Sequence, residues 1–156
     1  MIESTFPNLR MRRLRQSAFI RDLVQEQRLH SSDLIWPLFV CDGENLKEDV
    51  ASMPNVKRYS VDRIVEQART ATELNIPAIA LFPKTPGQLK DAAGSEALND
   101  QNLVCQAVRA VKSACPNLGI ICDVALDPYT DHGHDGILDD EGRIVNDGTV
   151  DKLVEQ

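Results

Sequence analysis

The sequence is short of aromatic residues, of positive charge and of long hydrophobic runs. Aromatic side chains make up 4% of its 156 residues, which leaves few rings for stacking on nucleic-acid bases. The net charge of −7 also disfavours binding to a nucleic acid. The longest apolar run, residues 34–41, is far shorter than the ~20 residues that cross a membrane as a helix. We therefore expect neither a nucleic-acid partner nor a membrane partner.

The sequence also has few cysteines and none of the common nucleotide-binding motifs. The four cysteines include no Cys-x-x-Cys pair, and the sequence shows no secretory signal peptide, so we expect reduced thiols and a cytoplasmic location. There is no Gly-x-Gly-x-x-Gly, no P-loop and no Gly-x-Ser-x-Gly motif. A dinucleotide enzyme, a P-loop nucleotidase and an α/β-hydrolase therefore have no support in the sequence.

The charges that are present are unevenly distributed. Residues 117–156 carry eight Asp and two Glu against one Arg and one Lys, a balance of −8. Residues 8–21 carry five Arg and no acid. We expect residues 1–33 to form an N-terminal arm, with a helix of weak periodicity between Arg12 and Arg28, that docks on an acidic protein surface.

Three apolar runs have the length of buried strands. They cover residues 34–40, 78–82 and 118–124. The unbroken apolarity of the first is typical of a parallel strand that is covered on both faces. Pro37 removes a hydrogen-bond donor from the first of them, so we expect an irregularity there. The turn-rich residues 42–59 are predicted to form a short hairpin.

Amphipathic segments separate and follow these strands. Helical spacing predicts one helix over about 61–75, a second that ends before Pro116, and a third near the C-terminus, after a small hairpin at 137–145. The candidate N-caps are Ser60 for the first helix, Asn99 or Asp100 for the second, and Asn146 or Thr149 for the third. The alternation predicts an α/β fold with a parallel sheet. A (β/α)₈ TIM barrel takes ~250 residues, so we expect a fragment of one: an extended arm at 1–33 and roughly the first three β/α units at 34–156.

The candidate site is the acidic loop, residues 123–136, which follows the third predicted strand. In parallel α/β folds, functional sites lie at the carboxyl ends of the strands, where this loop begins. Asp123 lies between two apolar residues of the predicted strand, so its carboxylate requires a partner or a function. Asp131, Asp139 and Asp140 are expected to serve only in turns.

Two metal motifs fail on spacing. The acidic loop is similar to a calcium loop in part, but its twelfth position is Gly142 instead of a glutamate. His132 and His134 supply two zinc ligands without a third at a defined spacing. A metal-dependent hydrolase that uses these histidines is therefore a weak alternative. Lys84, after the second predicted strand, is expected to be an ordinary loop lysine.

Several segments together match the pattern of one enzyme family. They lie at residues 12–15, 34–40, 52–54, 81–83, 123–136 and 136–139. In combination they resemble porphobilinogen synthase (delta-aminolevulinic acid dehydratase), and the resemblance extends over most of the chain. It implies a hydro-lyase that condenses two 5-aminolevulinate molecules to porphobilinogen in tetrapyrrole (heme) biosynthesis. It also implies a (β/α)₈ barrel whose N-terminal arm wraps a neighbouring subunit in a homo-octamer.

Two departures from the family pattern limit what carries over. Zinc-dependent members have three cysteines where this sequence has Ala125, Asp127 and Asp135. The zinc thiolate site is thus absent, and the carboxylates suit hard ions; the sequence resembles the magnesium-responsive branch, whose activating Mg²⁺ binds mainly in the other half of the barrel. Asp127 and Asp135 are weak candidates for metal ligands.

The second departure concerns the nucleophiles. The family's two Schiff-base lysines belong to the other half of the barrel, and no lysine here matches them, so we expect residues 1–156 alone to be inactive. The catalytic residues that the resemblance assigns to this chain are Asp123, Asp127, Tyr129, His134 and Asp135.

A second class of function stays open at this point. A half-barrel exposes an apolar sheet edge, which can pair with another copy. The chain is then a non-catalytic interaction module that associates with itself. A stable, well-folded monomer in size-exclusion chromatography would weaken that alternative.

Overall fold

The structure, a computed structural model, describes residues 5–9 and 12–156. The chain divides into two compact units, Met1–His30 and Ser31–Gln156. The candidate site lies wholly in the second unit. Within the described part of the chain, no helix is long and apolar enough to cross a membrane.

The first unit holds two short helical segments. The 3₁₀ turn η1 spans Arg13–Arg15, and helix α1 spans Ala18–Leu23. The prediction of one helix over 12–28 is wrong, because the chain leaves helical geometry at Ser17, whose backbone is extended. Neither segment buries a side chain, which fits a segment with little core of its own. Arg10 of the Arg-rich cluster lies outside the described residues.

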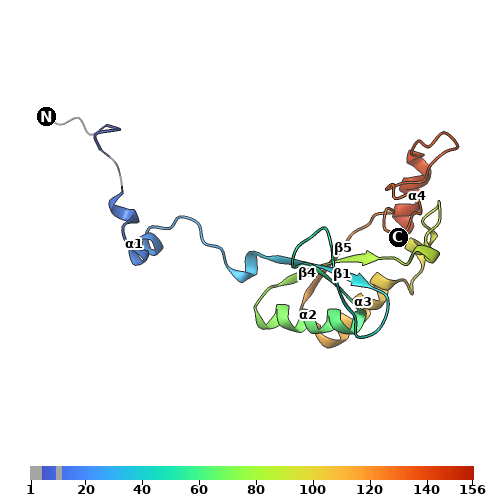
Figure 1. Ribbon diagram of the computed structural model, residues 1–156, viewed down its shortest axis with the longest axis horizontal. Helices are drawn as coiled ribbons and strands as arrows, with labels where there is room; N and C mark the ends of the chain where they lie inside the picture. The colour runs from blue at the N-terminus through green and yellow to red at the C-terminus, as the bar shows by residue number, and fades with distance from the viewer. Residues whose placement is uncertain (1–4, 10–11) are drawn as a thin grey trace. The chain divides into compact units, whose positions relative to one another are not determined.

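A five-stranded sheet forms the centre of the second unit (Figure 1). Its order is β2-β3-β1-β4-β5; β2 is antiparallel to β3, and all other neighbours are parallel. The apolar strands predicted from the sequence are β1, β4 and β5, and the predicted hairpin is the β2–β3 pair, so these predictions are confirmed. The strand bounds are Ile35–Cys41 for β1, Lys47–Asp49 for β2, Lys57–Tyr59 for β3, Ala78–Lys84 for β4 and Gly119–Cys122 for β5.

The sheet is regular at Pro37. Strands β1 and β4 pair without a bulge along their whole length, with Pro37 opposite Ala80. Strand β3 pairs with β1 only at Phe39 and Val40, so the edge of β1 that faces β3 carries no ladder at Pro37. A missing donor is tolerated at such a place, and the predicted irregularity is wrong.

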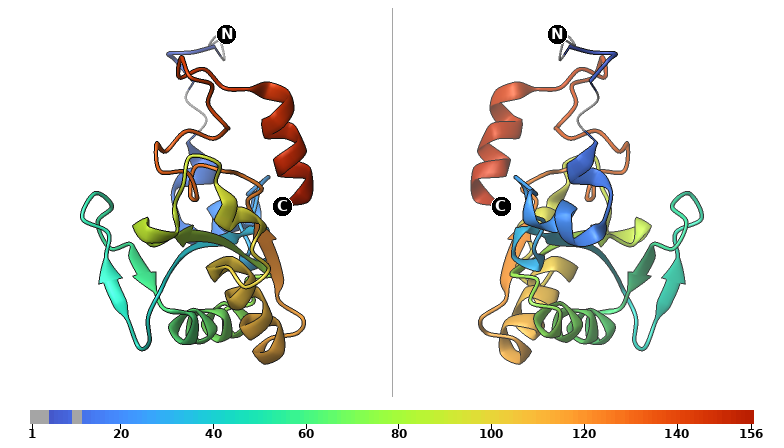
Figure 2. Two further views of the ribbon diagram at one scale, coloured as in Figure 1. Left: turned by 90° about the vertical axis from the view of Figure 1, so that its right-hand side faces the viewer. Right: turned by 90° about the vertical axis from the view of Figure 1, so that its left-hand side faces the viewer.

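Helices α2 (Val61–Glu73) and α3 (Leu103–Ala114) lie side by side on one face of the sheet (Figures 1 and 2). Both helices turn an apolar stripe toward the strands, as their spacing predicts. The core between helices and sheet is aliphatic. Its largest wholly buried side chains are Val40, Ile64, Ile79, Leu81 and Val111.

The opposite face of the sheet is less covered than the sequence predicts. Along β1, Trp36, Leu38 and Val40 pack in the core, whereas Ile35 is 54% exposed. On β5, which is an edge strand, Ile121 is 45% exposed. Within the residues described, helices cover one face of the sheet, and the other face is buried only in part, at Cys41 and Ala80.

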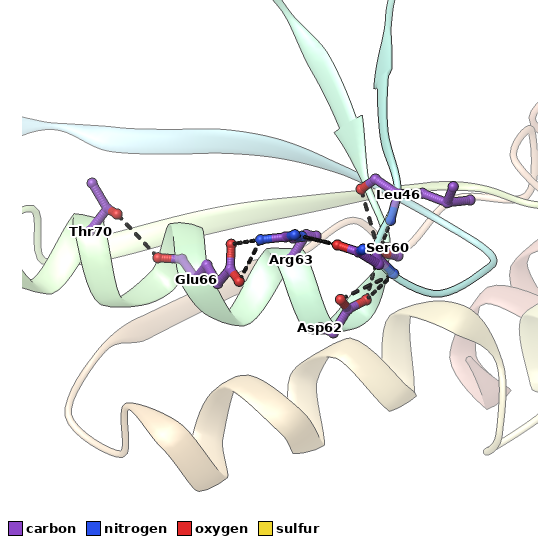
Figure 3. A network of polar contacts seen from close by, with 7 residues as sticks. Leu46, Ser60, Asp62, Arg63, Glu66 and Thr70 are labelled. Atoms are coloured by element: carbon purple, nitrogen blue, oxygen red, sulfur yellow. Dashed lines mark hydrogen bonds and ion pairs between the residues drawn. The ribbon is translucent and has the colours of Figure 1, made fainter.

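A polar network joins the loop after β1 to the start of α2 (Figure 3). Ser60 holds the N-cap position, as predicted, but its hydroxyl accepts from the Leu46 N–H at 2.8 Å and donates to Asp62 at 2.6 Å. Asp62 also accepts from the Asn45 N–H at 3.1 Å, and Arg63 donates to the Asn45 side chain at 2.8 Å. The Ser60 bond is the main cause of a lowered Asp62 pKa. Ser60 thus ties the loop to the helix instead of capping the helix backbone.

The other two predicted helix starts are corrected. Helix α3 is capped by Asn102, whose side-chain oxygen accepts from the Cys105 N–H at 2.9 Å; neither Asn99 nor Asp100 is the cap. Helix α4 spans Asn146–Glu155 with Val145 at the N-cap position and no side-chain cap. The remaining elements are the 3₁₀ turns η2 (Ser31–Asp33), η3 (Gly87–Leu89) and η4 (Ser95–Leu98).

Candidate active site

The carboxyl ends of β1, β4 and β5 lie at one edge of the sheet, because these neighbouring strands are parallel. Cys41, the last residue of β1, pairs with Lys84, the last residue of β4. Lys84 therefore ends a strand instead of lying in a loop, and its ammonium group forms an ion pair with Glu48 at 3.0 Å. The acidic loop leaves β5 at this same edge. The fold thus places it where parallel α/β proteins hold their sites.

Asp123 lies just outside the strand. Strand β5 ends at Cys122, and Asp123 is exposed. The expectation of a carboxylate inside a buried apolar strand is wrong, because the strand ends one residue earlier and Val124 beyond it is 56% exposed. Asp123 lines a cavity of about 230 Å³ together with Cys105, Cys122 and Tyr129.

The acidic loop has a small core of its own. Leu126 is wholly buried and packs against Ala97 and Tyr129. Ile137, from the segment that follows, and Leu153, from α4, pack against the same cluster. Leu126 therefore fixes the loop to this hydrophobic cluster, and the exposed carboxylates on either side of Leu126 are held in place by that packing.

Side-chain hydrogen bonds fix the two ends of the acidic loop. Asp135 accepts from the Leu126 N–H at 2.6 Å, which draws the ends together. The buried hydroxyl of Thr130 donates to the His134 carbonyl at 2.8 Å. Gly133, between them, has a φ of +73°, a conformation that suits glycine. Asp135 consequently shapes the loop in addition to any chemical role.

A second segment, residues 90–93 after β4, supports the acidic loop along its length. Asp91 forms an isolated parallel bridge with Thr130. The Asp91 N–H donates to the Tyr129 carbonyl at 3.3 Å, and the Asp91 carbonyl accepts from the Asp131 N–H at 3.2 Å. These contacts are made by the main chain, so they hold the loop's shape without using its carboxylates.

Two lysines that the sequence reasoning missed contact this region. The Lys90 ammonium nitrogen lies 3.5 Å from the Asp127 carbonyl oxygen, and that of Lys152 lies 2.9 Å from the Ala93 carbonyl oxygen. The paired residues are 37 and 59 positions apart in the chain. No local pattern marks such contacts, which only the tertiary fold creates.

The two histidines contact the loop and each other. His132 Nδ1 accepts from the His134 N–H at 3.1 Å, and His132 Nε2 lies 3.2 Å from the Ala92 carbonyl oxygen. Because a carbonyl only accepts, Nε2 carries the proton. Both ring nitrogens of His132 are thus engaged, which removes the support for a zinc hydrolase. The His134 ring lies 5.5 Å from that of His132, and its catalytic role stays a prediction.

Three carboxylates of the acidic loop influence one another. Partial burial raises the pKa of Asp127 above its ordinary value of 3.8, and the negative charges of Asp135 and Asp123 raise it further, while Lys90 lowers it. The fold therefore brings these three predicted site residues together. Their roles in a reaction stay predictions.

Tyr129 is 3% exposed and lines the same cavity as Asp123. Burial raises the pKa of its phenol to about 12, and the thiols of Cys105 and Cys122 contribute further. At neutral pH the phenol keeps its proton, so Tyr129 is suited to donating a hydrogen bond and not to removing a proton.

The described residues contain no group of three or more His, Cys, Asp or Glu side chains placed to hold a metal ion. Asp127 and Asp135 offer carboxylate oxygens of the kind that Mg²⁺ prefers, but one oxygen of Asp135 already accepts from Leu126. This pair supplies at most part of an octahedral shell. Their role as metal ligands stays a prediction.

The segment after the acidic loop forms the small hairpin that the sequence predicts. Leu138 and Ile144 make an isolated antiparallel bridge. Asp139 accepts from the N–H groups of Glu141 and Arg143 at 3.0 and 2.9 Å, which confirms its role in a turn. Thr149, a predicted N-cap candidate, instead accepts from the Ile137 N–H at 2.9 Å from within α4 and so joins this hairpin to the helix.

The raised pKa of Asp127 predicts a pH-dependent stability. Because the folded protein binds this proton more tightly than the unfolded chain, the free energy of unfolding falls as pH rises through the interval between the two pKa values. We expect Asp127→Asn to stabilise the protein at pH 7, by less than about 1 kcal/mol because solvent screens the charge. The gain should shrink as pH falls through that interval and vanish well below 3.8. Urea unfolding at several pH values measures this. Asp131→Asn, which removes a charge from the same loop, is the control, and a loss of stability in Asp127→Asn at pH 7 would contradict the prediction.

The fold and the position of the site define a class of protein. Strands β1, β4 and β5, joined by α2 and α3, are successive β/α units of a parallel sheet, with the acidic loop beyond their carboxyl ends. This is the arrangement of a (β/α)₈ barrel, here over part of its circumference.

The chain belongs to the delta-aminolevulinic acid dehydratase family, whose model matches residues 8–156. It is 55% identical over 148 residues to the delta-aminolevulinic acid dehydratase of Bradyrhizobium diazoefficiens, covering 95% of this chain and 42% of that relative. The enzyme of the same name from Ruminiclostridium josui is 38% identical over 146 residues, covering 92% of this chain and 69% of the relative.

A solved structure agrees with the sequence relatives. It is the delta-aminolevulinic acid dehydratase (porphobilinogen synthase) of Toxoplasma gondii ME49, in complex with the reaction product porphobilinogen. The similarity has a TM-score of 0.87 at 41% sequence identity, and it covers 94% of this chain and 42% of that chain. The chain thus spans less than half the length of several relatives that it matches, and the fold over that span is the one predicted.

Proposed function

We propose that this chain forms the first part of an enzyme that condenses two 5-aminolevulinate molecules to porphobilinogen, with loss of water, in tetrapyrrole biosynthesis. The observation that carries the proposal is the family match over residues 8–156. The similarity to a structure that holds porphobilinogen supports the same reaction. The activity belongs to the complete barrel, because the family's Schiff-base lysines have no counterpart in this chain.

In this proposal the acidic loop receives the substrate amine. Carboxylates accept hydrogen bonds from an ammonium group and favour its positive charge. Asp123, Asp127 and Asp135 lie close enough to raise the pKa of Asp127, so a bound ammonium would relieve their mutual repulsion. A carboxyl group with a raised pKa is also better matched to proton transfer near neutral pH. Asp127 is therefore our candidate for the proton-exchanging group, with Asp123 and Asp135 as its charge partners.

The two other predicted site residues have narrower roles. Tyr129 keeps its proton, so we assign it hydrogen-bond donation at the floor of the site. His134 is exposed, and its imidazole lies beside that of His132, so we assign it contact with substrate at the surface of the loop. Both assignments follow the resemblance to the family.

The metal and the assembly belong to this proposal as well. The absence of cysteine at residues 125, 127 and 135 favours Mg²⁺ over zinc, with binding mainly in the other half of the barrel. The described residues do not form a magnesium site by themselves, so no step is assigned to the metal. We also propose a cytoplasmic homo-oligomer, an octamer as in the family, in which the Arg-rich arm contacts a neighbouring subunit.

A complementation experiment tests the proposed function. The purified polypeptide of residues 1–156 is expected to form no porphobilinogen from 5-aminolevulinate. The same polypeptide, co-expressed with the remaining part of the Bradyrhizobium diazoefficiens relative, is expected to form it, because the second half supplies the nucleophilic lysines. Product is measured by its colour reaction with an aldehyde reagent.

The two measurements of this experiment can fail separately. Product from residues 1–156 alone would contradict the assignment of the nucleophiles to the other half. A folded, assembled pair that forms no product would contradict the proposed function. A stable assembly of residues 1–156 without any activity after complementation would favour the self-associating module instead.

A further inference from the structure

A second cavity, of about 220 Å³, lies at the carboxyl ends of β1 and β4 and is lined by none of the acidic-loop carboxylates. Asp42 and Thr85, which directly follow the paired ends of these strands, line one side. Further polar lining comes from η4, from the segment that joins it to α3, from α3 and from the acidic loop: Glu96, Asn99, Gln101, Gln106 and Tyr129. At ~30 Å³ per water molecule, the space holds roughly seven waters, which is the size of a small metabolite and below that of a typical drug site.

Thr85 is the residue that points to a ligand. It is 8% exposed, and its hydroxyl has no hydrogen-bond partner among the described residues. A buried hydroxyl without a partner costs about 1–3 kcal/mol, and native proteins leave few of them. Because Thr85 lines the cavity, a molecule held there is the partner that the geometry allows.

The charges around the cavity select the kind of ligand. The charged side chains that line it are both acidic, Asp42 and Glu96. Two of the three amide side chains have their donors engaged, since Asn99 donates to Glu96 at 3.1 Å and Gln106 donates to the Gln101 carbonyl at 2.6 Å. The side-chain oxygen of the third, Gln101, accepts from Arg109 at 2.9 Å. Beside the donors of Gln101 and Tyr129, the cavity offers two negatively charged carboxylates, which accept hydrogen bonds and favour a positive charge. Its ligand therefore carries N–H donors and a positive charge.

An apolar wall completes the cavity. Three apolar side chains stand beside the polar ones: Pro86, Leu89 and Leu103. Apolar side chains contribute nothing to the binding of a bare metal ion, and no group of three metal-ligating side chains occurs in the described part of the chain. We propose that this cavity binds a small primary ammonium compound with a short aliphatic stem, its ammonium group facing Asp42, Glu96 and Thr85. An ammonium group has three donors and no acceptor, which matches these three partners.

Binding is tested with n-propylammonium chloride and sodium propionate on the ¹⁵N-labelled 156-residue protein. At constant ionic strength, we expect propylammonium to shift the amide resonances of Thr85, Glu96 and their neighbours, with a Kd on the order of 1 mM. Propionate, of similar size but opposite charge, is expected to shift none of them. 5-Aminolevulinate, which also carries a primary ammonium group, is expected to shift the same resonances.

Two variants with a matched control locate the site. Glu96→Gln is expected to weaken propylammonium binding about tenfold, since a hydrogen bond to a charged partner is lost. Thr85→Val is expected to weaken it about fivefold without lowering the melting temperature, because it removes a hydroxyl that has no partner in the free protein. Asp100→Asn removes a charge from the same stretch of chain, is exposed and does not line the cavity; it is expected to change Kd less than twofold.

Several results would overturn the proposal. One is the absence of shifts with up to about 20 mM propylammonium, and another is equal binding of propionate. A third is equal weakening by Asp100→Asn and Glu96→Gln, which would reduce the effect to general charge attraction. A fourth is unchanged binding in Thr85→Val, which would show that water alone occupies the space beside that hydroxyl.

Discussion

Replacing Asp127 or Asp135 by alanine is expected to lower kcat by about 10²–10⁴-fold in the barrel completed with its second half. That range is typical for the loss of a positioned proton-transfer group. Asp127 has a raised pKa because of partial burial and its two acidic neighbours, and Asp135 is one of those neighbours. Removing either carboxylate therefore changes both the charge presented to the substrate amine and the proton affinity of what remains.

The two positions differ in what else they do, which allows charge and loop geometry to be separated. The Asp135 carboxylate accepts from the Leu126 N–H, nine residues away in the chain, whereas the Asp127 carboxylate has a backbone hydrogen bond within its own residue. Asp135→Asn retains an acceptor for Leu126 but loses the charge. If the charge matters, Asp135→Asn is as impaired as Asp135→Ala; if only the loop matters, Asp135→Asn retains most activity.

The controls for these variants come from the same surface. Asp131→Ala and Asp140→Ala remove exposed carboxylates that serve in turns or contact solvent, and they are expected to change kcat less than about twofold. Initial rates of porphobilinogen formation give kcat and KM separately. Wild-type turnover in both Asp127→Ala and Asp135→Ala would remove the acidic loop from the reaction.

Replacing Leu126 by alanine is expected to lower the free energy of unfolding by about 2–5 kcal/mol. Leu126 is wholly buried in a cluster with only Ala97 and Tyr129 as other fully packed members. Ala97, one of its two buried neighbours, is too small to fill the cavity that the truncation leaves. The cost therefore lies toward the upper part of the range for a leucine truncation.

The same substitution is expected to loosen the acidic loop more than the sheet. Hydrogen exchange of the Leu126 and Thr130 amides should accelerate relative to amides of β4, because these N–H groups depend on the loop's own packing. Leu74→Ala, at a leucine that is 54% exposed, is the control and is expected to cost less than about 1 kcal/mol. A loss below 1 kcal/mol for Leu126→Ala, or uniform acceleration of exchange, would contradict this account.

The strands and helices of the second unit were predictable because their signals are local. Apolar runs of strand length and 3.6-residue spacing depend only on neighbouring residues, and they located β1, β4, β5, α2 and α3 to within a few residues. Ser60 followed from the same kind of local signal. Asn102 did not, because Asn99, Asp100 and Asn102 are chemically similar, and the choice among them depends on where η4 ends.

The errors at the site have a different cause. The burial of Asp123 was inferred from its apolar neighbours, yet exposure at an edge strand depends on what packs beside it. The support given by Lys90 and Asp91 joins segments far apart in sequence, and no periodicity reports it. Loop position was therefore predictable from strand order, while loop geometry required the tertiary structure.

The way the acidic loop is supported also bears on how its chemistry can evolve. Its frame consists of main-chain contacts with Asp91 and the buried side chain of Leu126, so the side chain at position 127 can change without rebuilding the loop. Position 135 is constrained, because its side chain also holds the Leu126 N–H. An exchange between thiolate and carboxylate chemistry should therefore proceed in a preferred order. The loop's structure should tolerate substitution at 127 directly, and substitution at 135 only where another acceptor holds the Leu126 N–H.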